Sequence, residues 1–346
     1  MAPQINYALA RKVGQAALPP GPAITPAEAI SLVADLRRSV GSALGYVAEI
    51  TGLDEACRAA AQVPVAIVDR RGLVKANVGM AESLIEGAIT DDGAGWITRN
   101  AAGAQLGGLL AVMAARVLGQ FDPFANDGAG RVALVAPNVL RFERELGADP
   151  SDFHLWIALH EVTHAAQFSA APWLRDWLRG HLAQLAQEDD PDDEAGGPFK
   201  RLLAAARKLP HLLEDKGEGS QPLEGLLSRR QAQVLAEVTA TMSLLEGHAD
   251  VIMDAVGPAV LRSIEQLRPK FDARRVARGR LERAVRRLAG IEAKTAQYVQ
   301  GAAFVRAVLA EVGHEGLGAV WVGQQNLPTP AEMDDPSAWL ARVHGA

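Results

Sequence analysis

The sequence predicts a predominantly α-helical fold, of the α+β type with one small sheet. Apolar residues recur at helical spacing along most of the 346 positions, and only two short runs are rich in β-branched residues. Aromatic residues make up only 5% of the chain, whereas alanine, leucine, valine and glycine are abundant. We therefore expect helices that pack closely through small side chains.

Turn and capping residues predict where the first elements begin. Residues 25–28 combine a threonine N-cap, proline at the first helical position and glutamate three residues after the cap, so a helix is expected to start there. Residues 106–118 form an apolar segment that is also expected to be helical. The two β-branched runs, residues 64–68 and 131–136, are the expected strands.

Residues 120–130 divide the expected elements into two lobes. This segment contains glycine, proline, asparagine and aspartate, which are typical of a loop. We expect a mostly helical N-terminal lobe over residues 1–125 and a metal-binding catalytic lobe over residues 126–346. Within the second lobe, an aspartate N-cap followed by proline predicts a helix over residues 150–168, and residues 223–256 form another long helix.

Charge and cysteine content argue against several classes of function. The formal net charge is −6, so the chain as a whole has no electrostatic reason to bind nucleic acid or an anionic membrane. The basic run 268–287 also contains Asp272 and Glu282, and we interpret it as the solvated face of a helix. The single cysteine, Cys57, excludes an intrachain disulfide and a four-cysteine zinc site. Since no secretory signal or membrane-spanning segment is evident, we expect a cytoplasmic protein.

Residues 160–164 are the most informative segment. His160 and His164 are one helical turn apart, so both imidazoles lie on one face and can bind the same metal ion. Glu161 lies beside the first histidine, within reach of a water on the metal without binding the metal itself. The flanking residues are uncharged, as in a buried helix, where polar side chains are costly unless a partner satisfies them. The segment therefore predicts a zinc site.

A third protein ligand is expected on the second long helix, because a catalytic zinc ion has three protein ligands and one open position. Glu246 and Asp250 are one turn apart, as expected for a ligand carboxylate and a second carboxylate that accepts the other ring N–H of a ligand histidine. His248 lies on a different face, so only one of Glu246 and His248 can face the metal, and we favour Glu246. Neither His154 nor His181 is positioned to join the pair.

The two motifs, residues 160–164 and 246–250, resemble those of the glutamate-type zincin metallopeptidases. Over most of its length the chain further resembles the bacterial zincin-like metallopeptidases found with genes for deazaflavin coenzyme biosynthesis. The similar segments are residues 68–70, 117–122, 136–138, 159–168, 171–174, 246–250, 297–298, 301, 304–305 and 327–330. The resemblance implies a zincin-like fold, zinc ligands at His160, His164 and Glu246, and a catalytic base at Glu161.

The predicted function is a zinc-dependent hydrolase, in the first place a metallopeptidase that cleaves peptide or amide bonds. Zinc would acidify a water molecule and polarise the scissile carbonyl group, and Glu161 would carry the water's proton to the leaving amine. Tyr298 and His248 are candidate donors to the oxyanion.

Two alternatives stay open. One is a zinc-binding scaffold or interaction protein without catalysis. The other is an amide or ester hydrolase that acts on a small metabolite linked to deazaflavin coenzyme biosynthesis. Glu161 favours an enzyme over a scaffold, because a purely structural site needs ligands and no additional base.

Overall fold

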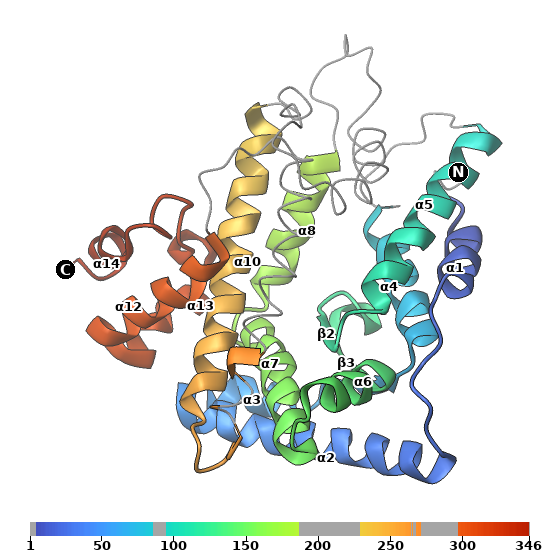
Figure 1. Cartoon of the computed structure of the whole chain (residues 1–346). Coiled ribbons are helices and arrows are strands. Elements are labelled where there is room, and N and C mark those ends of the chain that lie inside the picture. The colour runs from blue at the N-terminus through green and yellow to red at the C-terminus, as the bar shows by residue number, and fades with distance from the viewer. Residues whose placement is uncertain are drawn as a thin grey trace, which may run out of the picture.

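A computed structural model of the chain describes residues 5–85, 95–186, 229–263, 265, 268–270 and 297–345. It confirms the predominantly α-helical fold with one small sheet (Figure 1). Most of the predicted basic helix over residues 268–287 lies outside the described residues. The elements are α1 (Tyr7–Ala16), α2 (Pro26–Thr51), α3 (Asp54–Ala60), β1 (Val65–Val68), α4 (Arg70–Ile85), α5 (Trp96–Ala114), β2 (Gly119–Asp122), η1 (Asn126–Gly128), β3 (Arg131–Val135), α6 (Ala136–Leu146), α7 (Pro150–Ala170), α8 (Trp173–Ala186), α10 (Arg229–Ala255), α12 (Gln297–Leu317), α13 (Ala319–Val322), η2 (Gln324–Asn326) and α14 (Pro336–His344).

The sheet contains one strand that the sequence analysis missed. Its order is β1-β3-β2, with β1 parallel and β2 antiparallel to β3. The predicted loop over residues 120–130 is therefore wrong at its start, where β2 pairs with β3. β2 has only four residues, Gly-Gln-Phe-Asp, which is too short for an alternating pattern to indicate a strand. The predicted lobe boundary at residue 125 falls between these paired strands, and the division into lobes stays a prediction.

The two faces of the sheet are covered by different helices. Val132 and Leu134 of β3 belong to an apolar cluster with α2, α6 and α7, whereas Val135 packs with α1, α4 and α5. Since successive side chains of a strand point to opposite faces, these helices form separate layers. A third cluster joins the end of α7 to α8, α10, α12 and α14. In Figure 1, α12 and α14 lie on the side of α10 away from α1 and α5.

Helix α7 lies at the junction of these layers. It packs against α2, α3, β2, β3 and α10. It begins as predicted, because the Asp149 side chain accepts hydrogen bonds from the backbone N–H groups of Ser151 and Asp152. Nearly every side chain from Phe153 to Phe168 is buried. The segment with the histidine pair is thus a helix enclosed on almost all sides.

Glycines allow α12 to approach α10 closely. A β-carbon at Gly301 would lie 2.0 Å from the carbonyl oxygen of Ser243, and one at Gly247 would lie 2.1 Å from the carbonyl carbon of Gly301. No side chain fits at either position, so the two helix backbones touch directly. This contact fixes the position of α10 next to Glu246. Within the described ranges, no helix has the length and apolar character needed to cross a membrane.

Two of the segments that carry the family resemblance meet beyond the carboxyl ends of β1 and β3. Arg70 Nε donates to Asn138 Oδ1 over 2.6 Å, and both side chains are buried. The Asn138 amide nitrogen donates to the carbonyl oxygens of Ala114 at 2.8 Å and Val117 at 2.6 Å. Because Val117 precedes β2 by two residues, these bonds hold the start of that strand.

We expect Asn138→Leu to lower the free energy of unfolding by about 3 kcal/mol, because it leaves an Arg70 N–H group and two carbonyl groups buried without these partners. Chemical denaturation measures the change. Ser31→Ala, at an exposed site, is the control and should change the free energy by less than about 0.5 kcal/mol. Equal stability of the Asn138→Leu and Ser31→Ala proteins would contradict this role.

Candidate metal centre

Three side chains from two helices converge where α7 packs against α10. His160 and His164 extend from α7, and Glu246 extends from α10. The Nε2 atoms of the two histidines are 3.3 Å apart. The two Glu246 carboxylate oxygens lie 3.5 Å from Nε2 of His160 and 3.6 Å from Nε2 of His164. The side chains of the three predicted zinc ligands thus face one another.

The spacing of these atoms fits a tetrahedral zinc ion. Bonds of about 2.0–2.1 Å in a tetrahedron place neighbouring ligand atoms roughly 3.3–3.4 Å apart. The two histidine nitrogens, 3.3 Å apart, match that value, and each lies 3.5 or 3.6 Å from a different oxygen of the Glu246 carboxylate. Two histidines and one glutamate also form a known ligand set of catalytic zinc, which leaves the fourth position open. The residues present therefore suit this ion chemically and sterically.

The three side chains differ in their exposure to solvent. The side chains of His160 and Glu246 are 24% and 30% exposed, whereas that of His164 is 11% exposed. His164 is therefore the innermost of the three. His160 and Glu246 are therefore the two that are more exposed to solvent.

Glu161 lies against the first residue of β2. A β-carbon at Gly119 would lie 2.5 Å from Cγ and 2.6 Å from Oε1 of Glu161. The Glu161 side chain therefore occupies the space that a side chain at residue 119 would need. Glu161 is only 6% exposed. The structure thus places this carboxyl group at the contact between α7 and β2.

Gln167 is a site residue that the sequence analysis did not single out. Its side chain is fully buried. Oε1 lies 2.9 Å from Nδ1 of His164, and Nε2 lies 2.9 Å from the carbonyl oxygen of Leu245 and 3.0 Å from Nδ1 of His248. In the sequence, its position three residues after His164 could have indicated this contact, because that spacing puts both side chains on one face of the helix.

The structure brings Glu246, and not His248, to the histidine pair. His248 is 2% exposed and contacts Gln167 instead. Burial, together with the nearby rings of His314 and His164, lowers the pKa of His248 to about 3. At neutral pH the ring is therefore uncharged.

Two other histidines have partners outside the group. His154 Nε2 lies 2.8 Å from a carboxylate oxygen of Glu143, and His181 Nε2 lies 3.3 Å from one of Glu237. This agrees with the prediction that neither joins the pair.

The roles predicted for Asp250 and Tyr298 stay predictions. Asp250 is buried on α10, one turn after Glu246. Tyr298 belongs to α12, but its side chain lies outside the described residues. The acceptor that the structure shows for the Nδ1 side of His164 is Gln167.

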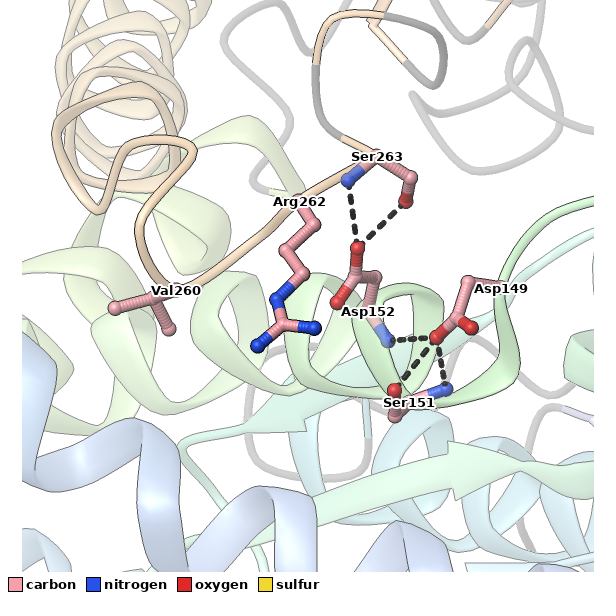
Figure 2. A pocket seen from close by; sticks show the side chains of 6 residues that line it. All are labelled: Asp149, Ser151, Asp152, Val260, Arg262 and Ser263. Atoms are coloured by element: carbon pink, nitrogen blue, oxygen red, sulfur yellow. Dashed lines mark hydrogen bonds between the residues drawn. The ribbon is translucent and has the colours of Figure 1, made fainter.

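A hollow of about 420 Å³ lies near the start of α7 (Figure 2). Its lining residues are Asp149, Ser151, Asp152, Val260, Arg262 and Ser263. The Asp152 carboxylate accepts 2.7 Å hydrogen bonds from the backbone N–H and the hydroxyl group of Ser263. These bonds tie the start of α7 to the chain after α10, roughly 12 Å along the helix from His160. We interpret the hollow as structural.

Two comparisons relate the chain to known proteins. Residues 5–340 match the family model for zincin-like metallopeptidases. The chain is also similar to a crystal structure of a "putative hydrolase with a novel fold" from Chloroflexus aurantiacus. The identity is 29%, the TM-score is 0.70, and the match covers 99% of each chain. No curated protein matches.

We expect Gly119→Ala to lower the free energy of unfolding by about 1–3 kcal/mol, because the added methyl group must displace Glu161 or β2. Gly108→Ala is the control, since a β-carbon there has no atom within 4 Å and alanine favours a helix. Chemical denaturation compares the two proteins. A Gly119→Ala protein as stable as the Gly108→Ala protein would show that Glu161 does not need this space.

Proposed function

The chain belongs to the zincin-like metallopeptidase family, and we propose that it is a zinc-dependent hydrolase that cleaves peptide or amide bonds. The convergence of His160, His164 and Glu246 carries the proposal. Glu161, next to the first histidine on the same buried helix, supports catalysis over a purely structural site. The similar chain from Chloroflexus aurantiacus is also described as a hydrolase.

The residues of the site divide the chemistry between them. His160, His164 and Glu246 would hold a zinc ion, which would supply the polarisation of a carbonyl group and the acidification of water. Glu161 accepts the proton of the attacking water and delivers it to the leaving nitrogen atom. It follows His160 by one residue, about 100° around the helix, so it leaves α7 next to the direction of the histidine pair. Gly119 leaves the room for that carboxylate against β2.

The position of β2 supports a peptide as the substrate. In the sheet order β1-β3-β2 it is one of the two edge strands among the described strands. The free edge of a strand presents backbone donors and acceptors that pair with an extended chain. Because Glu161 lies against Gly119, a peptide paired with β2 would pass beside the proposed base.

We expect one zinc ion per chain, bound through the converging ligand atoms. His160→Ala and His164→Ala should each abolish stoichiometric zinc, whereas His344→Ala, at an exposed C-terminal histidine, should retain it. Metal analysis after gel filtration makes the comparison. A full equivalent of zinc in both ligand variants would refute the metal site. Loss of zinc in His248→Ala together with retention in Glu246→Gln would transfer the third ligand to His248.

We expect Glu161→Gln to lower the rate of hydrolysis by a factor of about 10² to 10⁴, because the amide keeps the shape of the side chain but cannot accept a proton. Zinc content and thermal stability should stay close to those of the parent. Glu237→Gln, at a carboxylate next to His181, is the control and should leave the rate unchanged.

The assay first requires turnover by the parent protein on a peptide library or on amide-containing coenzyme precursors. Activity that survives Glu161→Gln would contradict the proposed mechanism. Turnover of the precursors alone would identify the metabolite hydrolase, and the link to deazaflavin biosynthesis would then be tested directly. A parent that binds zinc but hydrolyses neither the peptides nor the precursors would support the alternative of a zinc-binding scaffold protein.

A further inference from the structure

We infer that Gln167 is a positioning residue that selects the tautomers of two buried histidines, His164 and His248. We further infer that this selection leaves Nε2 of His164 free to bind a metal ion, and this part rests on the proposed zinc site. The tautomers themselves follow from the hydrogen-bond partners of Gln167 and require no metal.

The carbonyl group of Leu245 determines which way the Gln167 amide faces. A backbone carbonyl oxygen can only accept a hydrogen bond, so the atom 2.9 Å from it must be the amide nitrogen. The amide oxygen then lies 2.9 Å from Nδ1 of His164. Because an amide oxygen can also only accept, Nδ1 of His164 must carry the hydrogen.

The second hydrogen of the same NH₂ group determines the other ring. One hydrogen is donated to Leu245, and the other is directed at Nδ1 of His248, 3.0 Å away. That nitrogen must therefore present a lone pair, so the neutral His248 ring carries its hydrogen on Nε2. One amide thus imposes opposite tautomers on its two neighbours.

The tautomer selected for His164 is the one that a metal requires. With hydrogen on Nδ1, Nε2 has a free lone pair, and Nε2 is the atom that faces His160 at 3.3 Å and Glu246 at 3.6 Å. The opposite tautomer would direct an N–H group into this space. Leu245 also immediately precedes Glu246, so the same amide holds the backbone beside the third ligand.

A reversed amide would lose the hydrogen bond to Leu245. Its oxygen would face the carbonyl oxygen of Leu245, and no change of tautomer in His164 or His248 can relieve that contact. Since Gln167 is fully buried, these like groups would stay in contact. The packing of α7 against α10 at Leu245 therefore controls which nitrogen of His164 is free.

Nitrogen-15 NMR of the metal-free full chain reads the tautomers directly. We expect long-range ¹H–¹⁵N correlations to show hydrogen on Nδ1 of His164 and on Nε2 of His248. Loss of each ring's signals in His164→Asn and His248→Asn assigns them. Hydrogen on Nε2 of His164, or on Nδ1 of His248, would overturn the inference.

Two variants separate positioning from simple packing. Gln167→Met fills the space without polar atoms, so both His164 tautomers should appear and zinc affinity should fall about 10- to 100-fold. Gln167→Glu keeps the acceptor for His164 but removes both donors. His164 should therefore keep its tautomer, whereas His248 should move its hydrogen to Nδ1.

Gln231→Met, at another buried glutamine at the start of α10, is the matched control and should change neither the tautomers nor the affinity. Parent-like tautomers and zinc affinity in Gln167→Met would overturn the inference. If Gln167→Met does not fold, the parent and Gln167→Glu spectra still decide the tautomers. If the parent shows the expected tautomers but binds no zinc, the role of Gln167 in selecting the tautomers is supported and the proposed function is rejected.

Discussion

The burial of α7 is the constraint on which the rest of the site depends. A helix enclosed by α2, β2, β3 and α10 can carry polar side chains only where each has a partner, because an unpaired buried polar group costs several kcal/mol. Thr163 donates to the carbonyl oxygen of Leu159 at 2.7 Å, and His154 contacts Glu143 at 2.8 Å. His164 has Gln167 on one side of its ring and His160 and Glu246 on the other. The polar residues of α7 thus face specific partners instead of an open surface.

Close backbone contacts position the carboxylates of Glu161 and Glu246. Glu161 lies where β2 has no side chain at Gly119, and Glu246 precedes the glycine at which α10 touches α12. At such contacts a single methyl group meets another atom within 3 Å, so neither element can slide without loss of packing. The Arg70–Asn138 pair adds a polar restraint at the start of β2. Elements that bind no metal therefore decide where the proposed base and the proposed third ligand lie.

The features that the sequence predicted well are local ones. The spacing of His160 and His164, the Asp149 cap and the β-branched strands each depend on a few neighbouring residues, and the structure contains all of them. β2 was missed because four residues are too few to show an alternating pattern of apolar and polar side chains. The strand forms only by pairing with β3. Gln167 was missed because its role depends on Leu245 and His248, which are distant in sequence and reach it only when α10 docks.

The convergence of His160, His164 and Glu246 therefore depends on tertiary packing in two separate ways. Both histidines come from one helix, but Glu246 comes from another, so the ligand set is complete only when α10 lies on α7. The same docking supplies the Leu245 carbonyl group, which orients Gln167 and with it the His164 ring. A metal ion that binds only this docked arrangement stabilises it by mass action. The proposed ion and the α7–α10 contact would thus support each other, whereas the Arg70–Asn138 pair links β1 and β3 without involving α10.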